Sequence, residues 1–298
     1  MKVVRDPVDL PPAARTVAIG SFDGVHLGHR RVLDTAFETG LPVAVVTFDP
    51  HPRVLLGQPV ELLTTLERKV ELLAEYGVEE IVVLRFDREL AALTPKEFSL
   101  RYLGPLGAQI VVAGPDFRFG HDRSGDLDLL HEEGMLTRVV EPVPGVSSTT
   151  IRDALHEGDV GAAASLLGHP YELDGRVVPG LARGARLGFP TANLVFAPHQ
   201  LVPLDGIYAG AVSGLGNRAA VSIGVNVHFG GGERRVEVHL IDFSGDLYGQ
   251  RLVVELWQRL RDEQVFASDG ALAEQIARDV REAKEAVRPV LLDGGRQS

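Results

Sequence analysis

The first half of the chain alternates short apolar runs with amphipathic stretches. Four of these runs lack the polar alternation of a half-exposed strand, which is typical of strands buried on both faces of a sheet: residues 16–20, 42–48, 80–86 and 109–114. The stretches between them predict helices, among them 64–77 and 94–104, and residues 137–142 predict a further strand. Strands that alternate with helices indicate a parallel sheet with helices on both faces.

After about residue 170 the pattern changes to closely spaced strands. Five strand-like runs are separated by Gly, Asp and Pro: 171–178, 206–213, 218–227, 234–243 and 250–260. One clear helical pattern follows, over residues 271–287. We therefore expect an antiparallel barrel or sandwich with a C-terminal helix. The join falls near residues 166–173, which predicts one domain over 1–168 and a second over 169–298.

Composition narrows the classes of function. A length of 298 residues is enough for about two domains. The net charge of -11 argues against a nucleic-acid partner, because nucleic-acid surfaces neutralise phosphates with Lys and Arg. The absence of cysteine excludes disulfides, thiolate metal sites and cysteine nucleophiles. No signal-peptide core and no run of bilayer-spanning length stand out, so we expect a cytoplasmic protein with no membrane partner. The oligomeric state is not indicated.

A glycine-rich turn, IGSFDGVHLGH, joins the first buried strand to a helix. His26 and His29 lie at the expected helix N-terminus, where free backbone N–H groups and the helix dipole favour an anion. A polar surface turn is the plainer interpretation. Zinc binding with Asp23 and His51 is a third, although the histidine spacing does not match the i, i+4 zinc pattern. The position after a strand of an α/β sheet favours the anion site.

Two later stretches carry further polar side chains. SSTTIRDAL starts a predicted helix with Ser148 and Thr149 and has Arg152 in its first turns. Capping explains one hydroxyl, whereas hydroxyls together with a guanidinium suit a phosphate. The loop VAGPDFRFGHDRSGD contains Asp116, and a solvated loop explains it equally well.

The stretches GSFDGVHLGH, TFDPHPR, VAGPDFRFGHDRSGD and SSTTIR, in this order, resemble the nucleotidyltransferase domain of bacterial bifunctional riboflavin kinase/FAD synthetases. The resemblance implies a Rossmann-like α/β domain that transfers AMP from ATP to FMN and releases pyrophosphate. It implies that His26 and His29 are the catalytic contacts to the ATP phosphates and that Phe48 and Pro50 contact the flavin. The ATP-binding residues that it implies here are Gly20, Phe22, Asp23, Gly24, His26, Gly28, His29, Asp116, Ser148, Thr149 and Arg152. Such a transfer needs alignment and charge stabilisation rather than a protein nucleophile.

Two features of the second half carry candidate chemistry. RLGFPTANL joins a rigid Pro190 to Thr191 and Asn193, and in isolation a Gly-Pro turn explains it. In VEVHL, Glu237 alternates with apolar residues and shares a strand face with His239. On the outside of a barrel this pair would be ordinary, whereas inside or at a rim the carboxylate needs a role.

The stretches GFPTAN, GIYAG, VEVHLIDFSGDLYG and LRDEQVF resemble the riboflavin kinase module of the same family, a small β-barrel. The resemblance implies that riboflavin is phosphorylated to FMN with ATP and Mg²⁺, with Glu237 as the base for the ribityl hydroxyl. It implies that Arg261 and Phe266 bind the flavin. The residues that it implies for Mg-ATP are Gly188, Pro190, Thr191 and Asn193, of which Thr191 and Asn193 bind the metal. FMN and FAD are then substrates or products and not redox cofactors.

Two positions depart from the family pattern in the kinase half. Gly184-Ala185 stands where the family usually has Gly-Arg, and NVHF, with Val227 and His228, stands where many members read Asn-Pro-Thr-Phe. The leading hypothesis is one enzyme that converts riboflavin to FMN and FMN to FAD. One alternative is an FAD synthetase whose kinase half is weakened or altered in substrate. The other is a non-catalytic flavin or nucleotide sensor.

Overall fold

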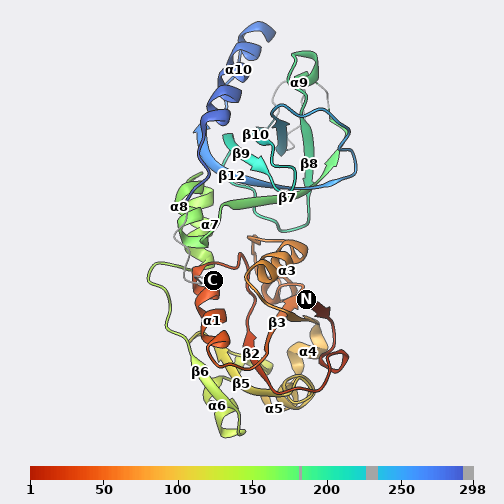
Figure 1. The fold of residues 1–298 in the computed structure, drawn as a ribbon, viewed down its shortest axis with the longest axis vertical. Helices are drawn as coiled ribbons and strands as arrows, with labels where there is room; N and C mark the ends of the chain where they lie inside the picture. The colour runs from red at the N-terminus through yellow and green to blue at the C-terminus, as the bar shows by residue number, and fades with distance from the viewer. Residues whose placement is uncertain (181–182, 226–233, 291–298) are drawn as a thin grey trace. The chain divides into compact units, whose positions relative to one another are not determined.

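The structure, a computed structural model, describes residues 1–180, 183–225 and 234–290. The chain divides into two compact units (Figure 1). The first comprises Met1–Val60 and Leu66–Val146, and the second comprises Glu61–Thr65 and residues from 147 onward. Helices α7 (Ser148–His156) and α8 (Val160–Leu167) thus belong to the second unit, upstream of the join expected at 168–169. The stretch NVHF lies outside the described residues.

The first unit is built on a six-stranded parallel sheet, which confirms the fold class expected for this half (Figure 1). The strand order is β1-β4-β3-β2-β5-β6, and every neighbouring pair is parallel. The short edge strand β1 has no counterpart in the sequence prediction. The strands are β1 (Lys2–Val4), β2 (Arg15–Ile19), β3 (Val43–Asp49), β4 (Glu80–Arg85), β5 (Ala108–Ala113) and β6 (Leu136–Val139).

Helices cover both faces of this sheet, which is why its central strands lack polar alternation. In β3, Val43 and Val45 pack in one apolar cluster with α1 and α3. Their neighbours Ala44 and Val46 pack in a second cluster with α4, α5 and α6. The helices of the first unit are α1 (Leu27–Phe37), α2 (Pro52–Leu55), α3 (Leu66–Glu75), α4 (Arg88–Ala92), α5 (Pro95–Phe98) and α6 (Leu127–Glu132).

The second unit is a closed antiparallel barrel, which decides between the two architectures that the sequence left open. The strand order is β10-β11-β8-β7-β12-β9, and β9 closes the barrel by pairing with β10. Strand β8 begins two residues after Pro190, inside the stretch that reads as a turn in isolation. The strands are β7 (Tyr171–Val178), β8 (Ala192–Phe196), β9 (Gly206–Val212), β10 (Arg218–Val225), β11 (Arg234–Leu240) and β12 (Arg251–Arg261).

The barrel interior is apolar and is closed by helices. Alternate residues of all six strands form one buried cluster, to which β11 contributes Val236 and Val238. Helices α7 and α8 join this cluster through Ile151 and Leu167. Helix α10 (Asp269–Glu285) packs instead on the outside of the barrel, where Ala283 contacts a separate cluster. Residues that alternate with the interior set therefore face outward.

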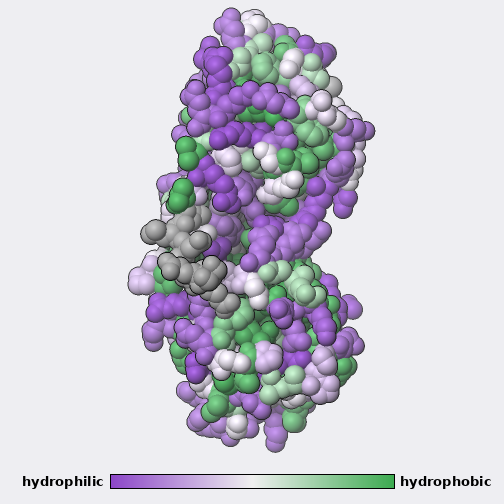
Figure 2. All heavy atoms as spheres, in the orientation of Figure 1, coloured by the Kyte–Doolittle hydropathy of each residue, from purple (hydrophilic) through white to green (hydrophobic). Residues whose placement is uncertain are grey.

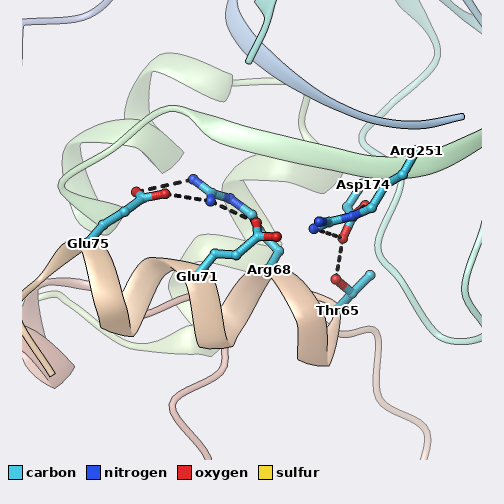
Figure 3. A network of polar contacts seen from close by, with 6 residues as sticks. All are labelled: Thr65, Arg68, Glu71, Glu75, Asp174 and Arg251. Carbon is cyan, nitrogen blue, oxygen red and sulfur yellow. Dashed lines mark hydrogen bonds and ion pairs between the residues drawn. The ribbon is translucent and has the colours of Figure 1, made fainter. Parts of the chain in front are cut away.

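The segment Glu61–Thr65 belongs to the second unit although it lies between elements of the first. The backbone N–H of Leu62 donates to the carbonyl of His199, and Leu63 is buried in the barrel cluster. The hydroxyl of Thr65 donates to Asp174, which also accepts two hydrogen bonds from Arg251, at 2.7 and 2.9 Å (Figure 3). The barrel is therefore completed by a piece of chain from far upstream.

Hydrophilic residues are spread over the face seen in Figure 2, with apolar residues scattered among them. Within the described residues, no helix combines the length and the apolar character needed to cross a membrane.

Candidate functional site

The turn between β2 and α1 is built around strained backbone. Phe22 and Val25 have positive φ angles of 49° and 42°, a left-handed conformation that costs a side-chain-bearing residue of the order of 1–2 kcal/mol. Gly24, with φ of 84°, meets the same demand without that cost. Residues held this way cluster at functional sites, because the surrounding packing must hold them in place. Phe22 and Val25 are accordingly buried.

The two histidines of this turn are stacked on one another. His26 caps α1, and its Nδ1 accepts the backbone N–H of His29 at 3.4 Å. The two rings lie 3.6 Å apart, centre to centre, with 17° between their planes. A Cβ on Gly28 would come within 3.1 Å of the His26 ring, so a glycine at this position leaves room for the stack. The motif thus folds as one compact element at the start of a helix.

His29 is held as a neutral imidazole. Burial lowers its pKa well below 6.5, and the charges of His26 and Lys69 lower it further. Its Nδ1 is buried and has no hydrogen-bond partner within the described part of the chain. A buried polar nitrogen without a partner is costly, and it marks a place where a ligand atom fits.

The other predicted residues of the first unit lie at the carboxyl edge of the same sheet. Gly20 directly follows β2, Pro50 follows β3, and Asp116 stands in the loop after β5. Because β3 and β5 both pair with β2 in parallel, these three strand ends are neighbours. Phe48, near the end of β3, has its ring 5.6 Å from that of Phe86, edge to face. Open α/β sheets bind their ligands at this edge.

The predicted phosphate clamp stands on the other unit. Ser148, Thr149 and Arg152 occupy the first turns of α7, and the Nε of Arg152 donates to the carbonyl of Glu61 at 2.6 Å. Ser147 caps the helix and exchanges hydrogen bonds with Thr150. The meeting of this clamp with His26 and His29 stays a prediction.

A pocket of about 300 Å³ lies on the outer side of the barrel. Its walls come from β9, β10 and β11, from α10 and from the chain between β12 and α10. Glu237 lines it and is half-buried there, so this carboxylate does not face the barrel interior. Helix α10 and the loops thus turn part of the outer face of the barrel into a pocket that contains Glu237.

Thr191 and Asn193 stand beside Glu237. The hydroxyl of Thr191 donates to Oε2 of Glu237 at 3.2 Å. Asn193 is the cross-strand partner of Glu237 in the pairing of β8 with β11. A Cβ on Gly180 would lie only 2.1 Å from the amide nitrogen of Asn193. The Asn193 side chain therefore packs against Gly180, where no residue larger than glycine fits. Three residues singled out from the sequence are thus together.

His239 supports the turn that carries Pro190. Its Nδ1 donates to the carbonyl of Pro190 at 2.8 Å, and its ring stands edge-on to Phe189 at 5.6 Å. Gly188 adopts a φ of 89°, which lets the chain reverse before Pro190. Ala185 is exposed on the short helix α9 (Arg183–Arg186), next to Gly184 in the pocket wall.

Arg261 is committed to an ion pair. Its guanidinium donates to both carboxylate oxygens of Asp279 on α10, at 2.8 and 2.7 Å, and lies 5.9 Å from the ring of Phe266. Asp279 is nearly fully buried, so this pair ties α10 to β12. Arg261 and Phe266 both line the pocket, and Arg261 shapes it through its partner.

Glu263 is a pocket residue that the sequence analysis missed. Burial raises its pKa, against a hydrogen bond from Ser222 at 3.3 Å. Nearby carboxylates, Asp205 and Glu237, also raise this pKa. A Cβ on Gly224 would collide with the Glu263 carboxylate, at 2.0 Å. The motif LRDEQVF contained this residue, but nothing in the pattern distinguished it from a solvated charge.

Within the described residues, no group of three or more His, Asp or Glu side chains is arranged to bind a metal ion. Any metal here would take other oxygen donors, such as hydroxyls, amides and substrate phosphates.

Comparison with known proteins covers both halves of the chain. The family described as FAD synthetase matches residues 11–152, and the family described as riboflavin kinase matches residues 167–287. The bifunctional riboflavin kinase/FMN adenylyltransferase of Escherichia coli (strain K12) is 40% identical over 96% of this chain and 97% of its own length. The protein of the same name from Bacillus subtilis (strain 168) is 38% identical over 91% of this chain and 92% of its own.

A crystal structure aligns along the same length. It is described as a macrolide-efflux protein from Streptococcus pneumoniae, with a TM-score of 0.83, 34% identity, and coverage of 96% of this chain and 99% of that one. The fold seen here is therefore shared with a solved structure over both units.

Proposed function

We propose that this chain, a member of the bifunctional riboflavin kinase/FMN adenylyltransferase family, carries out its two reactions at two separate sites, one in each half. The protein uses ATP in two reactions. It phosphorylates riboflavin to FMN, and it adenylates FMN to FAD. We assign each reaction to the residues of one site.

The barrel pocket carries the kinase reaction in this proposal. Glu237 takes the proton of the ribityl hydroxyl, whose oxygen then attacks the γ-phosphorus of ATP and releases ADP. Thr191 and Asn193 hold the nucleotide beside it. The observation that carries this assignment is the hydrogen bond from Thr191 to Glu237, which brings a nucleotide-binding hydroxyl and the base within 3.2 Å in one pocket.

Mg²⁺ fits the donors of this pocket. The Thr191 hydroxyl and the Asn193 amide oxygen are hard oxygen ligands, and Mg²⁺ is bound by few protein oxygens together with phosphates and water. When bound with ATP, the ion would neutralise charge that develops on the phosphates. Thr191 and Asn193 would hold it, while Gly188 and Pro190 shape the turn that presents them.

The turn between β2 and α1 carries adenylyl transfer. His26 and His29 contact the ATP phosphates, with the backbone of Gly20, Gly24 and Gly28 close by, and Ser148, Thr149 and Arg152 hold the β- and γ-phosphates. A phosphate oxygen of FMN then attacks the α-phosphorus while the bond to the pyrophosphate oxygen breaks. Because His29 is neutral, it serves as a hydrogen-bond donor rather than as a cation. Phe22, Asp23 and Asp116 complete this nucleotide site.

The two flavin sites use different residues. Phe48 and Pro50, at the end of β3, contact FMN for adenylation, and Arg261 and Phe266 frame the flavin in the kinase pocket. The functional boundary at 168–169 lies next to the start of the riboflavin kinase match at residue 167. We place both reactions in the cytoplasm, where ATP is supplied.

Substitution of His29 by alanine tests this division. FAD formation from supplied FMN should fall to background, while FMN formation from riboflavin continues at the parent rate. The two products are resolved by chromatography from one preparation. Equal loss of both activities in a folded variant would refute the division.

A further inference from the structure

A lysine that the sequence analysis passed over is nearly buried and takes part in no hydrogen bond or ion pair within the described residues. Lys69 lies on α3 with 5% of its surface exposed, and among the described residues no hydrogen bond or ion pair holds its ammonium. The other two buried cations of the described chain are ion-paired. Arg15 contacts Glu80 at 2.6 Å, and Arg68 contacts Glu75 at 2.7 Å (Figure 3). An ammonium that no hydrogen bond or ion pair holds, on a side chain that is nearly buried, points to a partner that arrives with a ligand.

The electrostatic neighbours of Lys69 place its ammonium by the nucleotide turn. Burial lowers its pKa, and the carboxylates of Asp23 and Asp49 partly offset this. Asp23 lies in the turn after β2, and Asp49 ends β3, the adjacent parallel strand. The Lys69 charge also lowers the pKa of His29, whose buried Nδ1 has no partner in the described chain. The buried Nδ1 of His29, which has no partner, and the ammonium of Lys69 therefore lie near one another, at the carboxyl edge of the sheet.

We propose that Lys69 binds a substrate phosphate in the adenylyl-transfer reaction. This rests on the proposed function of the turn that contains His26 and His29. The reaction joins two anions, the phosphate of FMN and the triphosphate of ATP, and their repulsion opposes the approach. His29 is neutral and cannot offset that repulsion with charge. Lys69 is the buried cation next to it, and an ammonium is a strong point-charge partner for phosphate.

The phosphate has two possible sources, FMN and ATP, and kinetics separate them. Lys69→Met keeps the length and apolar stem of the side chain and removes the charge. Lys69→Arg keeps the charge, and Lys96→Met, at an exposed position of α5, is the matched control. FAD formation is measured with FMN and ATP varied in turn, and riboflavin phosphorylation is measured on the same preparations.

We expect Lys69→Met to lower kcat/KM for FAD formation at least about 10-fold, the lower range for loss of a charged hydrogen bond. A loss confined to the FMN dependence identifies the FMN phosphate, and a loss confined to the ATP dependence identifies the triphosphate. Riboflavin phosphorylation should stay unchanged, Lys69→Arg should restore part of the activity, and Lys96→Met should match the parent.

Thermal unfolding without substrates separates a ligand-binding lysine from a structural one. Because no hydrogen bond or ion pair within the described residues holds the ammonium, its removal should leave the midpoint of Lys69→Met equal to or above that of the parent. The increase in midpoint caused by added FMN or ATP should shrink in this variant.

Two results overturn the proposal: FAD formation within twofold of the parent in Lys69→Met, or loss of both activities with a lowered midpoint that Lys69→Arg does not restore. Failure of the proposed function looks different, because His29→Ala would then keep FAD formation. If His29→Ala loses FAD formation and Lys69→Met keeps it, this inference alone fails.

Discussion

Replacement of Glu237 by glutamine separates a catalytic base from a hydrogen-bond acceptor. The carboxylate accepts one hydrogen bond from Thr191 at 3.2 Å, and among the described residues it has no other hydrogen-bond partner. Glutamine preserves the shape and one acceptor, so the contact itself, worth about 0.5–1.5 kcal/mol, is retained. The amide cannot take the proton of the ribityl hydroxyl. General-base catalysis contributes about 10²–10⁴-fold, which corresponds to a barrier increase of about 2.7–5.5 kcal/mol.

The assay follows FMN formation from riboflavin and ATP under saturating conditions. The kcat should fall at least about 10²-fold, with riboflavin binding little changed. FAD formation from supplied FMN should be unaffected in the same preparation, which serves as the folding control. A loss of less than about threefold in kcat would mean that Glu237 only holds Thr191. His239, on the same strand face, would then be the next candidate, because its Nδ1 donates to the carbonyl of Pro190 and leaves Nε2 as the acceptor of the neutral ring.

Three further predictions follow from burial and packing. Because burial holds the pKa of His29 well below 6.5, the unfolded state takes up the proton first as the pH falls. The free energy of unfolding should therefore decrease below pH 6.5, by up to about 1.4 kcal/mol per pH unit for this group, and His29→Gln should flatten that slope in denaturant titrations; an unchanged slope contradicts the burial. A fragment starting at Ser147 should unfold at a higher denaturant concentration than one starting at His169, because the longer one keeps the α7 and α8 residues of the barrel core; equal midpoints would show that these helices add nothing. Asp279→Asn should destabilise the barrel by about 3–5 kcal/mol, because it leaves the guanidinium of Arg261 with an uncompensated charge; circular dichroism melts check this, and a shift below about 1 kcal/mol contradicts it.

The sequence predicts the strands better than it predicts their surroundings. The runs behind β2 to β5 lack polar alternation because both faces of that sheet are covered, and this signal is local. In contrast, β8 begins two residues after Pro190, in a Pro-Thr-Ala-Asn stretch that by itself favours a turn. It forms a strand because it pairs with β7 and β11, which are distant in sequence. The short edge strand β1 likewise depends on β4 for its pairing.

The candidate site shows the same limit. Period two places Glu237 and His239 on one strand face, but helix α10 decides that this outer face forms a pocket. The helical pattern over 64–77 makes Lys69 look solvated, and only tertiary packing buries it beside the nucleotide turn. Arg261 carries no sign in the sequence of its ion pair with Asp279, which is 18 residues away. Such contacts depend on which elements pack together in the fold, and a local sequence pattern does not contain that information.

The most direct test of the account is a stoichiometric time course with riboflavin and ATP as the starting substrates. The parent protein, with Mg²⁺, should form FMN first and FAD after it, with one ADP released for each riboflavin phosphorylated and one pyrophosphate for each FAD formed. Glu237→Gln should stop the course at riboflavin and still adenylate added FMN, whereas His29→Ala should stop it at FMN. FAD that appears from riboflavin without ADP release, or variants that each lose both steps while folded, would contradict the assignment of one reaction to each site.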